Sequence, residues 1–82
     1  MIVKPLSTAV NIQSAASSVS EATLVSVVNT NTTPALIVNS NGNGVYIAAG
    51  ERMMIQKNPS ETLQATTGAS TAVWASSVAF TN

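Results

Sequence analysis

The side chains that could do chemistry gather in one stretch, NGNGVYIAAGERMMIQK, residues 41–57. Two Asn-Gly pairs open the stretch, and Glu51, Arg52 and Lys57 follow with one carboxylate and two cations. One interpretation is a glycine-rich phosphate-binding loop beside a catalytic cluster. The other is two turns joined to two strands. The first interpretation describes an enzyme, and the second describes a structural module.

The glycine pattern does not match a nucleotide-binding loop. A dinucleotide fingerprint needs Gly-x-Gly-x-x-Gly at the start of a helix, whereas Gly42-x-Gly44 is followed by Ile47 within a strand pattern. A P-loop ends on Gly-Lys-Ser/Thr, and that ending is missing. Asn-Gly pairs between apolar runs are typical of β-hairpin turns. We therefore interpret the stretch as a hairpin turn, a strand, a turn at Gly50 with positive φ, and a second strand.

Other catalytic arrangements find little support in the sequence. Glu51 and Glu61 are expected to be solvated turn residues that at most pair with Arg52 or Lys57, rather than a pair of catalytic carboxylates. Serine is abundant, but a nucleophile needs a base and an oxyanion site, and no motif supplies them. Histidine, cysteine and aspartate are absent, so the usual zinc, iron and copper ligand sets cannot form. We expect no enzyme, no metal and no cofactor.

The composition excludes further classes of protein. Charged residues make up 7% of the 82 residues, against roughly 25% in average soluble proteins, and three cations balance three carboxylates. Three scattered cations cannot form a basic surface for nucleic acid. A nearly uncharged surface favours association, since little repulsion separates the copies. No apolar run suits a membrane span or a signal peptide, so we expect synthesis in a cytoplasm and no membrane contact.

The elements that must position these side chains are short β-strands. Apolar bursts rich in Val, Ile, Leu and Thr alternate with polar clusters, and β-branched residues favour strands over helices. The strongest candidates cover residues 23–29, 35–40, 44–49, 52–57 and 72–80, and weaker ones lie near the N-terminus and at 61–66. Residues 14–24 should form a loop, with a short helical turn as the alternative. About seven or eight strands predict one all-β domain over residues 1–82, a compact antiparallel β-sandwich or small barrel.

Alternation along the strands predicts the core and the contact residues. The expected core is Leu24, Val25, Val27, Leu36, Val38, Val45, Ile47, Met53, Ile55, Leu63, Val73, Trp74, Val78 and Phe80. Because VSVV and ALIV are apolar on both faces, either both strands are central or another subunit covers one face. Trp74 is expected in the core, with a binding or contact surface as the alternative. The candidate contact residues are Tyr46, Glu51, Arg52, Met54, Lys57 and Trp74.

Four segments carry a resemblance to a known group of proteins. They are VKPLSTAVNI, ATLVSVVNTN, IAAGERMMIQKNPSETLQAT and AVWASSVAFTN, and together they cover nearly the whole chain. Their style and turn placement resemble small virion proteins of tailed bacteriophages, especially phages of marine bacteria. The resemblance implies a β-sandwich structural component present in many copies. It offers no functional residues and does not distinguish head, neck and tail.

The expectation is a non-enzymatic virion protein, made in the host cytoplasm, that decorates or cements a capsid. A tail, neck or fibre-attachment component is the first alternative, and a carbohydrate-binding module using Tyr46 or Trp74 is the second. The expected partners are the major capsid protein or tail and neck proteins, together with further copies of the chain in a homo-oligomer or multi-copy assembly.

Overall fold

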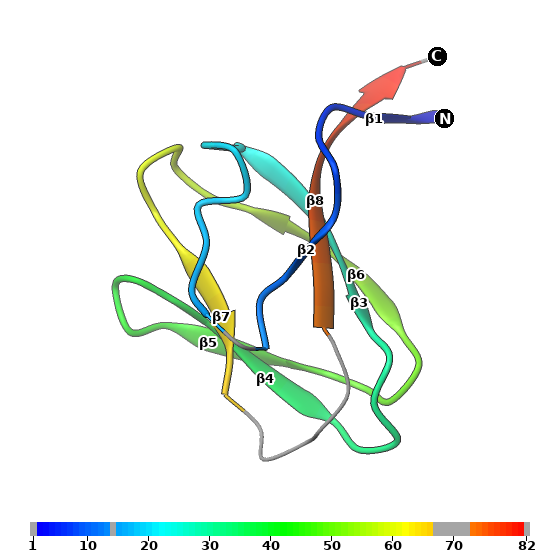
Figure 1. The fold of residues 1–82 in the computed structure, drawn as a ribbon, viewed down its shortest axis with the longest axis vertical. Coiled ribbons are helices and arrows are strands. Elements are labelled where there is room, and N and C mark those ends of the chain that lie inside the picture. The colour runs from blue at the N-terminus through cyan, green and yellow to red at the C-terminus, as the bar shows by residue number, and fades with distance from the viewer. Residues whose placement is uncertain (1, 14, 67–72, 82) are drawn as a thin grey trace.

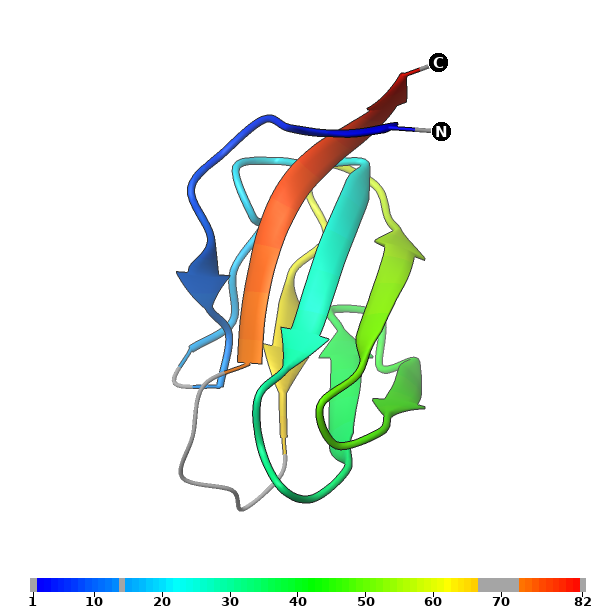
Figure 2. The same cartoon turned by 90° about the vertical axis from the view of Figure 1, so that its right-hand side faces the viewer.

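Eight short strands form two antiparallel sheets in the computed structural model, which describes residues 2–13, 15–66 and 73–81 (Figures 1 and 2). The five-stranded sheet contains β1 (Ile2–Pro5), β2 (Val10–Asn11), β3 (Leu24–Asn29), β6 (Arg52–Gln56) and β8 (Val73–Thr81). The three-stranded sheet contains β4 (Ala35–Asn39), β5 (Gly44–Ile47) and β7 (Leu63–Ala65). Within the described ranges there is no helix, and the sheets do not close into a barrel. The all-β prediction is confirmed in its sandwich form.

The strand order places the two segments that are apolar on both faces at the centres of their sheets. The larger sheet runs β1-β8-β3-β6, with β2 also pairing with β8, and the smaller sheet runs β5-β4-β7. Strands β3 and β4 are therefore each flanked by two neighbours. This confirms the first of the two explanations offered for VSVV and ALIV, which are the central parts of these strands.

The segment that follows β2 joins the two sheets along one side. The backbone N–H of Ile12 donates to the carbonyl oxygen of Val73 in β8 (2.9 Å). The carbonyl oxygen of Ile12 accepts from the N–H of Ala65 in β7 (3.1 Å). Farther along, Ser17 forms a bridge with Leu63 of β7. On the opposite side, neither β5 nor β6 has a second strand partner among the residues that the structure describes (Figure 2). The sandwich is thus closed on one side and open on the other.

The core between the sheets is made of small and β-branched side chains. Its buried cluster comprises Ile12, Val19, Ala22, Val25, Val27, Ala35, Ile37, Ile47, Leu63, Ala65, Val73 and Ala75. Six residues expected in the core are buried, namely Val25, Val27, Ile47, Leu63, Val73 and Val78. Met53 and Ile55 are partly buried and pack against the cluster. The side chain of Phe80, also expected in the core, lies outside what the structure describes.

The prediction that Leu36 and Val38 form the inward face of β4 is wrong. Ala35 and Ile37 are buried, whereas Leu36 and Val38 are only half-buried. Since all four side chains are apolar, alternation alone could not tell the inner face from the outer one. Leu24, also expected in the core, is likewise half-buried.

The expected core positions of Trp74 and Val45 are also wrong. Trp74 is 42% exposed, because its neighbours Val73 and Ala75 are completely buried and successive strand residues point to opposite faces. The core positions of β8 on either side of Trp74 are thus filled by a valine and an alanine. Val45 is equally exposed because β5 lies at the open side of the sandwich.

The two predicted glycine turns are confirmed. Gly42 has φ 87° at the end of the β4–β5 hairpin, where its N–H donates to the Asn39 carbonyl oxygen (3.0 Å). Gly50 has φ 74° between β5 and β6, in a turn closed by a bond from the Glu51 N–H to the Ala48 carbonyl oxygen (3.1 Å). Only the first turn joins strands of one sheet. The second carries the chain from the smaller sheet to the larger one.

The loop before β3 contains a left-handed turn. Val19, Ser20 and Glu21 have φ values of 53°, 58° and 56°, a region that L-residues rarely occupy consecutively. The N–H of Ala22 closes this turn on the Ser18 carbonyl oxygen (3.3 Å). Residues 15–23 form the expected loop and β3 begins at Leu24, whereas residue 14 lies outside the described residues. Burial of Val19 offsets the backbone strain.

Ser20→Gly is expected to raise the free energy of unfolding by about 1 kcal/mol. Ser20 is exposed, so the change removes a Cβ that opposes positive φ without removing buried contacts, and the gain exceeds the entropy of the more flexible unfolded chain. Urea unfolding measures the effect. The control is Ser60→Gly, the same change at an exposed turn position without positive φ, which should not stabilise the protein. Equal effects of the two changes would contradict the strain argument.

Candidate functional site

The outer face of the larger sheet brings three of the six candidate contact residues together. In the strand register, Val28 of β3 lies between Trp74 of β8 and Arg52 of β6. In the next outward-facing row, Ser26 lies opposite Met54 of β6. Trp74, Arg52 and Met54 therefore belong to one surface, which we call the β8–β3–β6 face. It presents an indole, a guanidinium and a thioether to the outside.

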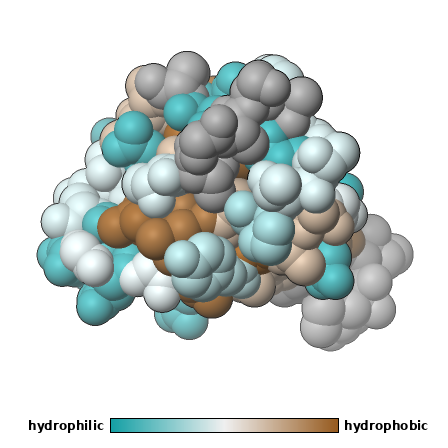
Figure 3. All heavy atoms as spheres, turned by 90° about the horizontal axis from the view of Figure 1, so that it is seen from below, coloured by the Kyte–Doolittle hydropathy of each residue, from teal (hydrophilic) through white to brown (hydrophobic). Residues whose placement is uncertain are grey.

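Tyr46 belongs to a different surface. It lies opposite Leu36 on the outer side of the smaller sheet and is 68% exposed. Together with the half-buried Leu36 and Val38 it forms what we call the β4–β5 face. Figure 3 shows the molecule from below relative to Figure 1, on the side where β4 and β5 lie. An apolar patch bordered by polar residues is visible there. The two outer faces point away from each other, so the candidates do not form a single site.

Glu51 is exposed in the turn between β5 and β6, and a buried asparagine holds that turn in place. The side-chain Nδ2 of Asn29 donates to the carbonyl oxygens of Thr33 (3.0 Å), Ile47 (3.2 Å) and Ala48 (3.2 Å). Its Oδ1 accepts bonds from the backbone and side-chain nitrogens of Asn31, at 3.0 and 2.9 Å. Asn29 thus anchors the chain on both sides of the crossing between the sheets.

The backbone of Asn29 completes this arrangement. Its N–H donates to the carbonyl oxygen of Glu51 (2.9 Å), and its carbonyl oxygen accepts from the N–H of Gly50 (2.9 Å). Asn29 was not among the predicted key residues, because it ends the strand expected at residues 23–29. The available signal was an asparagine closing an apolar run, a residue whose side chain readily bonds nearby backbone groups.

Lys57, one of the candidate contact residues, is buried. It is 6% exposed, and its Nζ donates to the carbonyl oxygens of Ala22 (2.7 Å) and Asn58 (3.2 Å). Burial lowers the pKa of the Lys57 amine, while the negative charges of Glu61 and Glu21 act in the opposite direction. Lys57 therefore ties the loop before β3 to the end of β6 and is poorly placed to meet a partner.

The lowered pKa of Lys57 predicts a rise in stability with pH on the alkaline side. The unfolded chain binds more protons than the folded one between the lowered pKa and the ordinary value of 10.5, so the free energy of unfolding increases across that window. Urea unfolding from about pH 8 to about pH 11 measures it in the wild type and in Lys57→Met. The wild type should gain stability relative to Lys57→Met as the pH rises. Lys4→Met, which removes an exposed lysine, controls for the loss of one charge. A constant difference would contradict the prediction.

Glu61 has a structural role. Its Oε2 accepts a bond from Nδ2 of Asn41 in the β4–β5 hairpin, and its Oε1 accepts from the N–H of Asn58, both at 2.7 Å. The carboxylate therefore connects the hairpin to the turn that follows β6. Glu51 lies in the separate β5–β6 turn.

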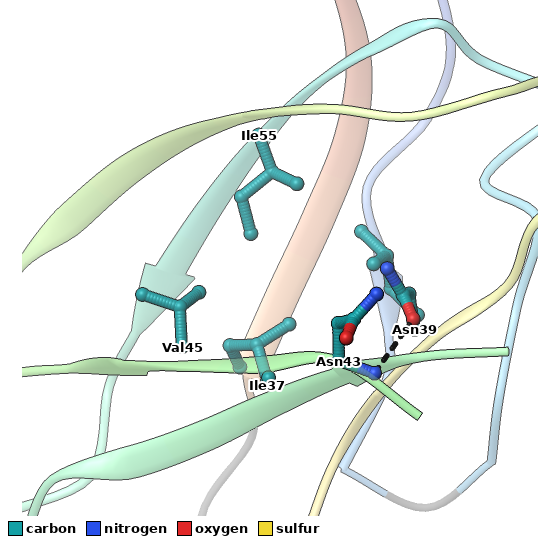
Figure 4. Close-up of a pocket in the computed structure, with 7 residues that line it drawn as sticks. Ile37, Asn39, Asn43, Val45 and Ile55 are labelled. Atoms are coloured by element: carbon teal, nitrogen blue, oxygen red, sulfur yellow. Dashed lines mark hydrogen bonds between the residues drawn. The ribbon is translucent and has the colours of Figure 1, made fainter. Parts of the chain in front are cut away.

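A small pocket lies between the sheets at the open side of the sandwich. Figure 4 shows Ile55 of β6 pointing toward Ile37 and Val45, with Asn39 and Asn43 joined by a hydrogen bond at the rim (3.1 Å). The pocket holds about 170 Å³ and is lined mostly by apolar side chains. That volume lies below the roughly 300–1,000 Å³ of typical small-molecule sites. It would accommodate one small apolar group.

The fold and these surfaces define an all-β, sandwich-like domain with an aromatic side chain on each outer face. The chain has no significant match among protein-family models, curated proteins or solved structures. The resemblance to phage virion proteins therefore stays a prediction. In the part of the chain that the structure describes, no helix has the length and hydropathy needed to cross a membrane.

Proposed function

We propose that the chain is a non-enzymatic structural protein of a phage virion that decorates or cements the capsid shell. The observation that carries the proposal is the exposure of aromatic side chains on both outer faces, Trp74 on one and Tyr46 on the other. Both lie outside a core composed largely of small residues. Exposed apolar surface of this kind is typical of proteins that bury it against partners.

Two contact faces that point in opposite directions suit a protein that bridges neighbours. The β8–β3–β6 face would pack against one capsid subunit and the β4–β5 face against another. Because only 7% of the residues are charged, burying these faces would desolvate few charges. Binding across a junction between subunits would stabilise the shell against internal pressure.

The location of the protein in particles tests the proposal directly. Purified virions of the phage that encodes the chain are analysed by mass spectrometry and cryo-electron microscopy. Density for the chain on the shell is the expected result, and its absence from virions would overturn the proposal. A copy number of roughly hundreds indicates the head, while roughly tens or fewer indicate a tail, neck or fibre-attachment component instead.

Trp74→Ala and Tyr46→Ala are each expected to weaken binding to particles at least about tenfold, since aromatic anchors dominate interface energies. Both side chains are exposed, so the fold should persist, which circular dichroism checks. Gln64→Ala is the control, because Gln64 is exposed on the same small sheet as Tyr46 but is polar. Co-sedimentation with particles lacking the protein measures binding. Wild-type binding by both aromatic variants would show that neither face makes the contact.

Carbohydrate binding is a second candidate, which the exposure of Trp74 favours. An indole that is 42% exposed on the outer face of a sheet is accessible for stacking against a sugar ring. A glycan array compares wild type, Trp74→Phe and Trp74→Ala. Binding that survives in Trp74→Phe and is lost in Trp74→Ala would support this function. An array without any binding would exclude it for the glycans displayed.

A further inference from the structure

Among the residues that the structure describes, strand β6 forms a sheet edge with little protection against pairing. Natural edge strands are usually blunted by proline, a bulge, a lysine or a covering segment. The register between β6 and β3 continues without a bulge from Arg52 to Gln56, and the strand between these two residues is Met53-Met54-Ile55. The edge of β7 in the other sheet, by contrast, is covered at Leu63 by the segment containing Ser17.

The hydrogen bonds between β3 and β6 show which backbone groups of β6 point outward. Just beyond one end of the strand, the Lys57 N–H donates to the Thr23 carbonyl oxygen, and just beyond the other, the Asn29 N–H donates to the Glu51 carbonyl oxygen, both at 2.9 Å. In an antiparallel ladder, hydrogen-bonded pairs alternate with pairs that are not hydrogen-bonded. The even-numbered residues of β6 therefore direct their N–H and C=O groups away from β3. These residues are Arg52, Met54 and Gln56.

We propose that this edge pairs with the same edge of a second copy of the chain. An antiparallel arrangement around a two-fold axis at Met54 places Met54 opposite Met54 of the second copy. It also places Arg52 opposite Gln56, and Gln56 opposite Arg52. Each of these pairs can exchange both of its N–H···O bonds, because all three residues direct their backbone groups outward. The larger sheet then continues from one copy into the other.

The charges of the strand agree with this register. The guanidinium of Arg52 meets the neutral amide of Gln56, so the two arginines are not opposite each other. Shifting the strands by two residues would leave at least one outward residue of each strand without a partner. The formal net charge of the chain is zero, so there is no overall repulsion between copies. The edge of β6 is therefore complementary to the same edge of a second copy in its backbone groups, its register and its charges.

Strand β5, the other edge on the open side of the sandwich, is less suited to this pairing. β5 spans Gly44–Ile47, and the bond from the Asn39 N–H to the Asn43 carbonyl oxygen implies that only Gly44 and Tyr46 direct backbone groups outward. The β6 pairing is argued from the strand itself and does not rest on the proposed virion role. It would join the β8–β3–β6 faces of two copies into one continuous surface.

Sedimentation of the purified chain tests the dimer. A contact this small is expected to be weak, so concentrations from about 10 μM to about 1 mM are compared. The expected result is a concentration-dependent monomer–dimer equilibrium. Met54→Pro removes the central outward N–H without removing a bond to β3, and should weaken the dimer at least about tenfold. Met54→Leu, which keeps the N–H and the apolar side chain, should dimerise like the wild type.

A charge pair at Gln56 tests the register without proline. Gln56 is exposed, so its substitution should leave the monomer fold intact. Gln56→Glu places a carboxylate opposite Arg52 in both symmetric positions and should tighten the dimer by roughly two- to thirtyfold. Gln56→Lys places like charges there and should weaken it by a similar factor. Equal effects of the two substitutions would overturn this register.

Hydrogen exchange identifies the edge that is used. On raising the protein concentration, the amides of Arg52, Met54 and Gln56 should become protected, while those of Met53 and Ile55 are protected at all concentrations. A chain that stays monomeric throughout overturns the proposal. So does protection confined to β5, which would show that the other edge makes the contact. Because the experiment uses only the purified chain, its outcome is independent of whether virions contain the protein.

Discussion

Replacing Asn29 by alanine should lower the free energy of unfolding by about 3 kcal/mol. The change removes a completely buried amide whose Nδ2 donates to three carbonyl oxygens and whose Oδ1 accepts from Asn31. Each buried polar group left without a partner costs about 1–3 kcal/mol, and several lose theirs together. A small domain has only about 5–15 kcal/mol in total, so the loss is a large part of its stability. Urea or thermal unfolding measures it.

The matched control is Asn58→Ala, the same chemical change at an exposed position. It should alter the free energy of unfolding by no more than about 0.5 kcal/mol. A second comparison is Asn29→Asp, which keeps the acceptor oxygens but loses the Nδ2 donor and buries a carboxylate. It should be more destabilising at neutral pH than at acidic pH, where the carboxyl is protonated. An Asn29→Ala variant as stable as Asn58→Ala would contradict the anchoring role.

The Asn29→Ala substitution should also have a local effect on the turn between β5 and β6. The N–H of Gly50 donates to the carbonyl oxygen of Asn29, and the Asn29 side chain donates to Ile47 and Ala48 just before the β5–β6 turn. Loss of the side chain should therefore speed hydrogen exchange at Gly50 more than at the centre of β3. The relative placement of the two open edges would then change, so Asn29 affects the interaction surface although it lies inside.

The strands and turns could be predicted because their signals are local. The stretch at 41–57 contains Gly42 and Gly50 at the positions that need positive φ, with alternating apolar residues between them. The strands observed at β3, β4, β5 and β6 begin and end within two residues of the expected ranges. Backbone preferences of neighbouring residues are sufficient for this level of structure.

The inner faces could not be predicted where both faces are apolar. In β4, Ala35 and Ile37 point inward and Leu36 points outward, although size alone would favour leucine inside. In β8 Val73 and Ala75 point inward, so Trp74, the largest side chain of the strand, points outward. Such choices depend on the volume between the sheets, which no single strand encodes.

The candidate site was recovered only in part, for a related reason. Arg52, Met54 and Trp74 share a face because β3 lies between β6 and β8, and this order cannot be read from spacing along the chain. Lys57 is buried because the loop ending at Ala22 lies across it. Neither effect depends on residues adjacent in sequence. Long-range register therefore determines which expected contact residues are accessible.

Ile12→Ala should lower the free energy of unfolding by about 3 kcal/mol. The side chain is completely buried in the core, and truncation of such residues typically costs 2–5 kcal/mol through lost burial and the cavity that is left. Ile12→Val, which removes a single methylene, should cost about 1 kcal/mol. Leu6→Ala is the control, because Leu6 belongs to the same N-terminal region but is 56% exposed, and it should have little effect.

The outcome of Ile12→Ala also tests how the sandwich is closed. Ile12 bonds through its backbone to both Val73 of β8 and Ala65 of β7, so its segment is the only described connection along that side. If closure contributes to global stability, all core amides should lose protection together in hydrogen exchange. If only the amides of Ile12, Ser17 and Ala65 lose protection while the rest of the core keeps it, the segment is a separable cover. The sheets would then be held together by the remaining core side chains, and the closed side would be as accessible to a strand partner as the open one.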